Sequence, residues 1–300
     1  MPCKLCSKEP VRTLTNNKIK LCRNCFFKYF ERKVAKTILK YQLIRKGDYI
    51  GIALSGGKDS MSILYILSSY CRKKRIKFMA VMIDEGVKNY RNFDKIKVFC
   101  EKNNIPYKIY SFRDEFGFNL NDAMKKTKLK GCTVCGTLRR ALLNKKAREL
   151  GFTKLVTGHN LDDEAQSVLM NQFKGNLERS SRLGPISGSI KDEKFIPRIK
   201  PLYFVLEEEV RLYAKLRKFP IIKDRCPFAS DSYRDSVKSM LNKFEKQYEG
   251  TKHAIINSFM NILPYLKKAY SKSKLRYCNS CGEPCSGDIC KTCDFIKKLK

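Results

Sequence analysis

Residues 49–60 read Tyr-Ile-Gly-Ile-Ala-Leu-Ser-Gly-Gly-Lys-Asp-Ser, an apolar run that passes directly into a glycine turn. Beyond the turn, Ile63, Ile66, Leu67 and Tyr70 recur on one stripe at helical spacing. This order of strand, glycine turn and helix aims a helix N-terminus at any group above the turn. The first N–H groups of a helix have no internal partners and carry partial positive charge. The stretch therefore predicts a phosphate-binding turn.

The composition of the turn supports this interpretation. Gly56 and Gly57 allow close approach of the backbone to a ligand, because no Cβ stands in the way. Ser55 and Ser60 add hydroxyls, and Lys58 adds a fixed charge. The P-loop of kinases and GTPases needs a longer spacing between its glycines. SGGKDS instead resembles the PP-loop of ATP pyrophosphatases, which adenylate an oxygen and release pyrophosphate. The alternative is a tight turn with a serine N-cap and no ligand.

The bulk properties limit the class of protein. A chain of 300 residues, 43% of them hydrophobic, can form one α/β domain with small appendages. No apolar run approaches the roughly 20 residues of a membrane helix, and the N-terminus has no signal-peptide core. We therefore expect an intracellular, cytoplasmic protein. The net charge of +34, from 63 basic and 29 acidic residues, favours a polyanionic partner such as RNA or DNA. A merely solvated basic surface and an anionic membrane are the alternatives, and the absence of a strongly amphipathic basic helix disfavours the membrane.

Fourteen cysteines in a chain with no secretion signal indicate metal sites rather than disulfides. Two Cys-x2-Cys pairs lie near each end, and each group of four predicts a tetrahedral zinc ribbon. Each cysteine-rich end has too few residues to bury a core of its own. Metal binding would therefore supply the free energy of its folding. Paired disulfides are the alternative, and a fifth thiol in the second ribbon, Cys285, receives no role. The predicted zinc ligands are Cys3, Cys6, Cys22 and Cys25 at one end and Cys278, Cys281, Cys290 and Cys293 at the other.

Between the ribbons, short apolar runs alternate with helical patterns. Repeated βα units predict a doubly wound parallel sheet with ligands at the carboxyl ends of its strands. We expect a zinc ribbon over residues 1–30, a nucleotide-binding domain over 31–270 and a second ribbon over 271–300. Strands are expected at 49–54, 77–83, 106–111 and 154–157, and helices beyond Ser60 and near 91–103, 136–150, 161–173, 207–218 and 235–248.

A second strand-to-helix turn, residues 157–163, reads Thr-Gly-His-Asn-Leu-Asp-Asp. Asn160 suits the N-cap of the helix, and Asp162 and Asp163 suit its positive end, so capping alone explains all three. Two adjacent carboxylates at a strand end also suit a Mg²⁺ ion that bridges ATP phosphates. Asp84 ends another strand, where backbone groups can read an adenine edge. His159 is not assigned as a general base, because a lone histidine is usually structural.

Three cysteines of the central region form a separate group. Cys132 and Cys135 open the helix that carries Arg139 and Arg140, and Cys226 lies far downstream. A Cys-x-x-Cys pair at a helix N-terminus gives thiols of low pKa. Three thiolates also suit a 4Fe–4S cluster that keeps one iron free of protein ligands. From the spacing alone, an iron–sulfur cluster, a redox pair and structural thiols are equally open.

The ordered set SGGKDS, TGHNLDD, CTVCGTLRR and RCPF, with both ribbons, resembles the TtuA/NcsA family of tRNA 2-thiouridine synthetases over essentially the whole chain. The resemblance implies that Cys132, Cys135 and Cys226 ligate a 4Fe–4S cluster and that Asp59 and Asp163 are catalytically important. It also implies tRNA as the partner and a homodimer. The nucleotide contacts expected from the motifs and the resemblance are Ser55, Gly56, Gly57, Lys58, Asp59, Ser60, Asp84, Gly158, His159, Asp162 and Asp163.

The resemblance implies a reaction in two stages. ATP with Mg²⁺ adenylates the C2 oxygen of a uridine, and Lys58 and the helix N-termini stabilise the phosphate charge. Sulfide on the open iron then attacks C2, and AMP leaves. Arg139 stands where some relatives carry a catalytic lysine; a guanidinium neutralises phosphate but does not act as a base. The sulfur donor, free sulfide or a ubiquitin-like carrier, is open.

Two segments of the sequence bear on which uridine of the tRNA is modified. Residues 136–140 and 171–176 look more like the wobble-position enzymes, so the wobble uridine is expected and the T-loop uridine is the alternative. A PP-loop ligase of the lysidine-synthetase type is a second alternative, and it would not require the central cysteines. A non-enzymatic zinc-ribbon RNA-binding protein is the third.

Overall fold

The computed structural model describes residues 2–14, 18–88, 90–127, 129–188, 192–222, 224, 226–229, 233–271 and 275–299. Helices and strands alternate through the central part of these ranges. The helices are α1 (Arg23–Lys40), α2 (Lys58–Lys74), α3 (Asp94–Lys102), α4 (Phe112–Phe116), α5 (Leu120–Lys126), α6 (Gly131–Glu149), α7 (Leu161–Phe173), α8 (Leu177–Ser181), α9 (Glu207–Arg217), α10 (Tyr233–Gln247), α11 (Thr251–Ala269) and α12 (Lys291–Leu299). The strands are β1 (Arg12–Thr13), β2 (Lys20–Leu21), β3 (Tyr49–Ala53), β4 (Lys77–Asp84), β5 (Tyr107–Ser111), β6 (Lys154–Val156), β7 (Ile186–Ser187), β8 (Arg198–Ile199), β9 (Arg276–Tyr277) and β10 (Pro284–Cys285).

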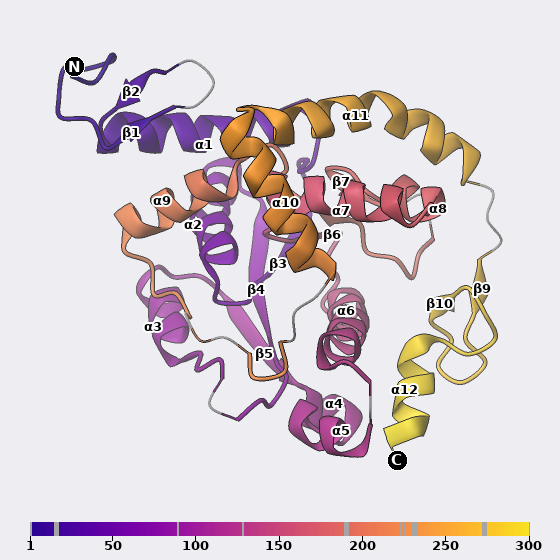
Figure 1. Ribbon diagram of the computed structural model, residues 1–300. Helices are drawn as coiled ribbons and strands as arrows, with labels where there is room; N and C mark the ends of the chain where they lie inside the picture. Colours follow the sequence, from indigo (N-terminus) through magenta and orange to yellow (C-terminus); the bar gives the residue numbers. More distant parts are fainter. Residues whose placement is uncertain are drawn as a thin grey trace.

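A six-stranded sheet lies at the centre of the molecule (Figure 1). Its strand order is β5-β4-β3-β6-β8-β7, and the first five strands are parallel. The edge strand β7 runs antiparallel to β8. The expected doubly wound parallel sheet is therefore confirmed, with an antiparallel edge that the sequence patterns did not indicate.

Strand β4 shows why both faces of the sheet are covered. Ala80 and Met82 point into a core that contains the buried faces of α1, α2 and α9. Val81 and Ile83 point into a second core that contains Val134 and other residues of α6. Because side chains alternate along a strand, a continuous apolar run such as β4 needs apolar cover on both sides.

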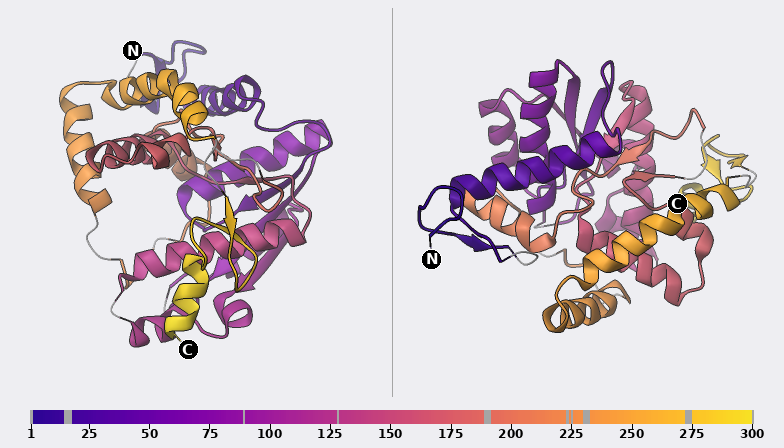
Figure 2. Two further views of the ribbon diagram at one scale, coloured as in Figure 1. Left: turned by 90° about the vertical axis from the view of Figure 1, so that its right-hand side faces the viewer. Right: turned by 90° about the horizontal axis from the view of Figure 1, so that it is seen from above.

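A third group of helices lies beside the sheet and away from its edge strand β5. Helix α7 packs against α8, α10 and α11 around a core that includes Tyr203, Ile256 and Phe259. The left view of Figure 2 separates this group from α6 and the C-terminal segment. None of the helices in the described ranges is long and apolar enough to cross a membrane.

The two cysteine-rich ends lie far apart (Figure 1). The N-terminal hairpin of β1 and β2 is continuous with the main core, because Leu14 and Leu21 join the cluster that includes Phe26 of α1. At the other end, α12 packs against α6 and buries Phe295 there. The expected division at residue 30 falls inside α1, whereas that at 271 falls just after α11, and both divisions stay predictions.

Most of the expected central elements are present near their expected bounds. Helix α7 spans 161–173 as expected, whereas α6 begins at Gly131, five residues before the expected 136. The helices α1 and α11 were not expected, although α1 carries buried Phe26 and Phe30 at helical spacing. Helix α1 was not predicted because its first residues lie within the expected zinc ribbon, residues 1–30. Arg225 of the RCPF motif lies outside the described residues.

Candidate functional site

The glycine turn leaves the start of α2 open. Gly56 has φ +79°, and Gly57 is the N-cap, with no side-chain cap bond in the described structure. The two serines bond inside the turn instead: Ser55 Oγ lies 3.1 Å from Ser60 Oγ, which in turn donates to the Gly57 carbonyl at 3.0 Å. The N-cap of α2 is therefore a glycine and not a serine, and the start of α2 lies at a cavity lined by Gly57, Lys58 and Asp59.

The second turn lies directly against the first. A Cβ on Gly158 would stand 3.0 Å from the Ser60 nitrogen and 3.2 Å from Asp59 Cβ, so a larger residue there would push the two turns apart by a few tenths of an ångström. Asn160 Nδ2 donates to Asp59 Oδ1 at 2.9 Å. The carboxyl ends of β3 and β6 thus bring two helix N-termini together, as the sequence predicted.

Asn160 and Asp163 form a capping box at the start of α7. The Asn160 side chain accepts from the Asp163 nitrogen at 3.2 Å, and Asp163 Oδ2 accepts from the Asn160 nitrogen at 3.1 Å. Burial raises the pKa of Asp163 to about 6, and the neighbouring charge of Asp59 acts in the same direction. Two close carboxylates of this kind suit a divalent cation.

Asp162 has a different environment from Asp163. It is 4% exposed, and one carboxylate oxygen pairs with Lys252 of α11. The other oxygen accepts from the Glu207 nitrogen at 2.7 Å, at the start of α9. Asp162 thereby joins α7, α9 and α11, and its predicted contact with nucleotide stays a prediction.

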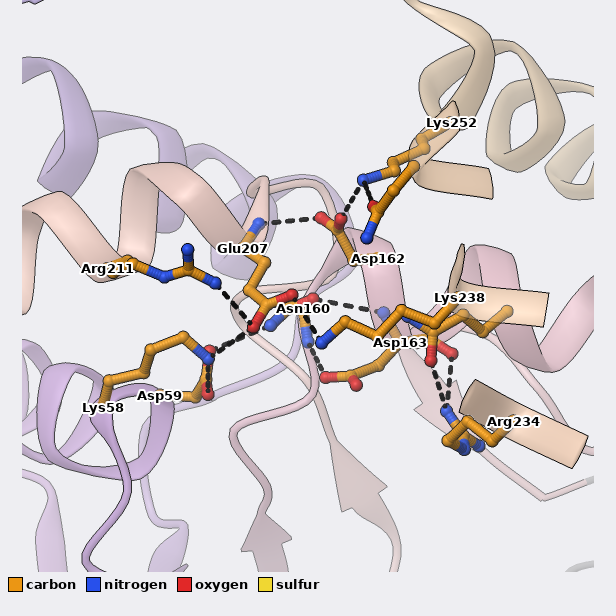
Figure 3. Close-up of polar contacts among 12 residues, drawn as sticks. Lys58, Asp59, Asn160, Asp162, Asp163, Glu207, Arg211, Arg234, Lys238 and Lys252 are labelled. Carbon is orange, nitrogen blue, oxygen red and sulfur yellow. Dashed lines mark hydrogen bonds and ion pairs between the residues drawn. The ribbon is translucent and has the colours of Figure 1, made fainter. Parts of the chain in front are cut away.

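Lys58 of the turn is held by two carboxylates. Its Nζ lies 2.8 Å from Asp59 Oδ2 and 3.0 Å from Glu207 Oε1. Figure 3 shows Lys58, Arg211 and Lys238 converging on Glu207 from α2, α9 and α10. The ion pairs of Glu207 with Arg211 and Lys238 were not predicted from the sequence, because acidic residues at the start of a helix are usual and indicate no special site.

The central cysteines come together as expected. Cys132 and Cys135 lie in the first turns of α6, and Cys135 and Cys226 pack against the same apolar cluster as Phe228. The thiol of Cys132 lies 3.8 Å from the Phe228 carbonyl oxygen. Burial raises the pKa of Cys135 to about 11, and Cys226 lies near enough to act in the same direction. A raised pKa disfavours the redox-pair alternative, which requires a thiolate of low pKa.

Glu85 is a buried carboxylate beside these thiols that the sequence analysis missed. It is 2% exposed and directly follows the predicted contact Asp84. One Glu85 oxygen pairs with Arg91, lies 3.3 Å from Arg139 Nη1 and lies 4.0 Å from Cys135 Sγ. Arg139, for which the sequence predicts a role in catalysis, thus lies beside Glu85 and Cys135.

His159 is an exposed residue surrounded by cations, and its Nδ1 is 2.9 Å from Thr157 Oγ1. Desolvation lowers the pKa of His159 to about 3, and nearby positive charges act in the same direction. The ring therefore stays neutral at physiological pH, which agrees with leaving it out of the list of general bases. The cations that contribute are Lys200, Arg234, Arg198 and Arg139.

Asp84 shapes the loop after β4. Its Oδ1 accepts from the Gly86 nitrogen at 2.8 Å, and the Asp84 side chain is half-buried. This local turn holds Glu85 in place between the two sites. An adenine contact at Asp84 stays a prediction.

A short segment joins the glycine turn to the cysteine triad. The Ile222 nitrogen donates to the Gly56 carbonyl at 3.0 Å, and a Cβ on Gly56 would meet Ile222 at 2.5 Å. Four residues further along the chain lies Cys226, and a Cβ on Gly131, at the start of α6, would meet Phe228 at 2.8 Å. Among the described residues, Ile222 at the glycine turn and Phe228 at the start of α6 thus stand on either side of Cys226 in the chain, so the turn and the thiols contact the same stretch of sequence.

The terminal cysteines fit zinc. In each group of four, the sulfur atoms lie within 4.8 Å of one another, as ligands of a single ion do. Backbone hydrogen bonds, that of Cys22 first, lower the pKa of Cys3 to about 6, and the Cys290 backbone does the same for Cys278. Cys285 stays outside the second group and donates to the Gly287 carbonyl at 2.8 Å.

The central triad fits a cluster better than a single ion. Among the described residues, Cys132, Cys135 and Cys226 are not within the 4.8 Å that one ion requires. Three thiolates that ligate three different irons of a cluster stand further apart than ligands of one metal. The donor set, three thiols with the guanidinium of Arg139 close by, suits an anionic iron–sulfur group.

Comparisons with known proteins agree with this arrangement. Residues 28–244 match the family described as the PP-loop domain. A probable sulfurtransferase of Methanocaldococcus jannaschii is 39% identical over 93% of this chain and 83% of its own length. A tRNA-5-methyluridine(54) 2-sulfurtransferase of Pyrococcus horikoshii is 34% identical over 98% of this chain and 93% of its own. The structure of the U34-tRNA thiolase NcsA from Methanococcus maripaludis, with its 4Fe–4S cluster, superposes with a TM-score of 0.85 at 32% identity, over 100% and 96% of the two chains.

Proposed function

This chain belongs to the PP-loop family and, within it, to the TtuA/NcsA-type tRNA 2-thiolation enzymes, and from that premise we propose that it replaces the C2 oxygen of a tRNA uridine by sulfur. The observation that carries the proposal is the connection between the two halves of the site. Ile222 bonds to the glycine turn, and Cys226, four residues on, joins the cysteine triad. One substrate base placed between these halves would reach both ATP and the sulfur-delivering thiols.

The glycine turn performs the activation. The open N–H groups of α2 and the charge of Lys58 would bind the phosphates of ATP, and Asp59 and Asp163 would hold Mg²⁺. These groups stabilise the charge that develops as the uridine oxygen attacks the α-phosphate and pyrophosphate leaves. The uridine oxygen thereby becomes part of a leaving group, AMP.

The cysteine triad supplies the sulfur chemistry. Cys132, Cys135 and Cys226 would hold a 4Fe–4S cluster, which supplies an iron without a protein ligand as a Lewis acid for sulfide. Arg139, fixed by Glu85, keeps a positive charge beside this site and neutralises the phosphate of the departing AMP. The two terminal groups of four cysteines would each bind a zinc ion that stabilises the fold of that end of the chain.

The substrate is tRNA, and the wobble uridine is the proposed position. The net charge of +34 supports binding to an RNA backbone. Residues 136–140 and 171–176 resemble the wobble enzymes, and a U34 thiolase superposes closely, while a relative of similar identity is named for position 54. We propose that the protein acts in the cytoplasm, where ATP and tRNA are available. We propose that it forms a homodimer and that its sulfur donor is sulfide or a ubiquitin-like carrier.

Oxygen labelling tests the adenylation step. In tRNA with ¹⁸O at uridine C2, the label should leave in AMP, with one AMP for each 2-thiouridine formed. Label that stays in the tRNA, or that appears in bulk water, contradicts adenylation of the base. Mass spectrometry of the labelled nucleoside identifies its position, and 2-thiolation at the T loop alone would overturn the wobble assignment.

Two other functions make different predictions in the same assay. A ligase of the lysidine type would release AMP but attach an amine, and it would work without iron. An RNA-binding scaffold would release neither AMP nor pyrophosphate. The three central thiols, together with the structural match to a U34-tRNA thiolase that carries a 4Fe–4S cluster, favour the thiolation enzyme over both.

A further inference from the structure

Glu207 is a carboxylate surrounded by three cations next to the glycine turn (Figure 3). Lys58 Nζ lies 3.0 Å from Glu207 Oε1, and Lys238 Nζ lies 3.0 Å from Oε2. Arg211, one turn along α9, is 3.4 Å from Oε1. Three separate helices therefore direct a positive charge at one acidic side chain.

The electrostatics show that Glu207 is charged. Partial burial would raise the pKa of Glu207, but the charges and hydrogen bonds of Lys58 and Lys238 outweigh it and lower that pKa to about 2. Three cations share this one carboxylate and Asp59, so the cluster keeps an excess of positive charge. Such an excess attracts further anions.

A cavity opens beside two of these cations, Lys58 and Arg211. It has a volume of about 520 Å³ and is lined on one side by Gly57, Lys58 and Asp59 of the glycine turn. The other side is α9 and the residues that follow it, which present Arg211, Lys215 and Lys218 together with apolar residues: Ala214, Phe219, Ile221 and Ile222. The three basic side chains are exposed and recur at helical spacing, so they line one wall together. A polyphosphate chain has the charge and size for this cavity.

The cations around Glu207 are free to change partners. The side chain of Arg211 is 68% exposed and that of Lys238 is 40% exposed, so neither is locked by packing. Glu207 itself is fixed, because its backbone nitrogen donates to the buried Asp162. A phosphate group that enters the cavity thus competes with a stationary carboxylate for mobile cations.

We propose that Glu207 is a built-in competitor for pyrophosphate, and that Arg211 and Lys238 are the phosphate-binding cations it holds in the empty state. This inference rests on the proposed function, in which ATP binds at the glycine turn and pyrophosphate is released. ATP binding draws the cations from Glu207 to the β- and γ-phosphates. After adenylation, the carboxylate takes them back, which weakens the hold on pyrophosphate and speeds its release.

Equilibrium binding of Mg²⁺-pyrophosphate, ATP and AMP to the full-length protein tests the proposal by calorimetry. Glu207→Gln keeps the size of the side chain and removes its charge, so pyrophosphate and ATP should bind about tenfold more tightly. Arg211→Ala and Lys238→Ala should each weaken both ligands by about tenfold. AMP, which lacks the β- and γ-phosphates, should bind equally to all variants. In turnover, Glu207→Gln should lower KM for ATP and strengthen inhibition by added pyrophosphate.

Glu208→Gln is the matched control, because Glu208 is the next residue of α9 and pairs with Arg12 instead. It should bind all three ligands as the wild type does. A Glu207→Gln variant that binds pyrophosphate no more tightly, or Arg211→Ala and Lys238→Ala variants that bind it normally, would overturn the inference. The assays need no tRNA, so a protein that binds pyrophosphate as described but makes no 2-thiouridine refutes only the proposed function. If Glu207→Gln does not fold, the two cation variants decide the outcome.

Discussion

Asp163 is a carboxylate whose environment opposes its own charge. Burial raises its pKa from 3.8 to about 6. The folded protein therefore holds a proton on Asp163 between pH 6 and pH 3.8 that the unfolded chain has lost. By linkage, this group favours the folded state as the pH falls through 6 and costs stability at neutral pH. Such a carboxylate is stabilised when a divalent cation binds.

Asp163→Asn should therefore raise the free energy of unfolding at pH 7.5 by about 1–2 kcal/mol. The amide oxygen can still accept from the Asn160 nitrogen, so the capping box survives. Urea unfolding at pH 7.5 and pH 4 checks this, and the gain should vanish at the lower pH. The same variant should lose AMP formation. A variant that is less stable at pH 7.5 would show that the Asp163 charge is already compensated in the empty protein.

At this scale the sequence identifies residues that belong to motifs and misses those that act on them. Asp59, Asp163 and the three central cysteines follow from recognisable spacing. Glu85 does not, because only the fold brings a residue at the end of β4 next to Cys135. The ion pairs of Glu207 likewise come from three helices, α2, α9 and α10, that are far apart in the sequence and meet only in the fold.

At the scale of elements, the glycine turn depends on two different glycines. Gly56 has a positive φ, and a Cβ there would stand 2.5 Å from Ile222 and 2.6 Å from Ile96. Gly57 has φ −77°, and a Cβ there would meet only Ser55 Oγ, at 3.6 Å. The first glycine is thus required by the fold, and the second by the space left for a ligand.

Gly56→Ala should lower the free energy of unfolding by about 1–3 kcal/mol, because it combines backbone strain with a clash in the core. Gly57→Ala should lower it by less, about 0.5–1 kcal/mol, because glycine is preferred to alanine at an N-cap but neither a clash nor a positive φ is involved. Both variants should weaken ATP binding. Thermal unfolding and ATP titration of the two variants separate these effects, and equal stability loss in both would contradict the account.

The two ribbons should each hold one zinc ion. Cys278→Ser should leave one zinc per chain by metal analysis, because a tetrahedral site rarely survives the loss of a thiolate. Cys285→Ser is the control and should keep two, since Cys285 stands outside the group. Loss of zinc from the Cys285→Ser variant would show that the ligand set includes this fifth thiol.

The fold follows from the sequence where apolar patterns are long or repeated. The run of β4 predicts a strand covered on both faces, and the structure places cores on both sides. The two-residue strands β7 and β8 carry too few residues for a periodic signal, so the antiparallel edge was not predictable. Helix α1 was hidden because its first turn overlaps the Cys22 and Cys25 pair of the ribbon.

At the scale of the whole molecule, the dominant property is charge. A net charge of +34 on 300 residues produces a field that favours an RNA backbone. Several cations, including Arg140 and Arg198, lie close to one another in the cleft, and burial together with their neighbours lowers their pKa values. The field therefore extends into the site and is not confined to the surface.

Binding of tRNA should depend steeply on salt. If the protein neutralises six or more phosphates, the affinity should fall by roughly 1000-fold or more between about 50 and about 200 mM salt. Filter binding or fluorescence anisotropy with full-length tRNA measures the slope. A nearly flat dependence would show that the basic surface is not the tRNA-binding surface.

We propose that the protein activates uridine at the glycine turn and supplies sulfur at the cysteine triad. The decisive experiment is Cys226→Ser in anaerobically prepared protein, with tRNA, ATP, Mg²⁺ and sulfide. We expect a burst of pyrophosphate, both zinc ions retained, a destabilised 4Fe–4S cluster and no 2-thiouridine. Normal formation of 2-thiouridine by Cys226→Ser, with its zinc content unchanged, would contradict it.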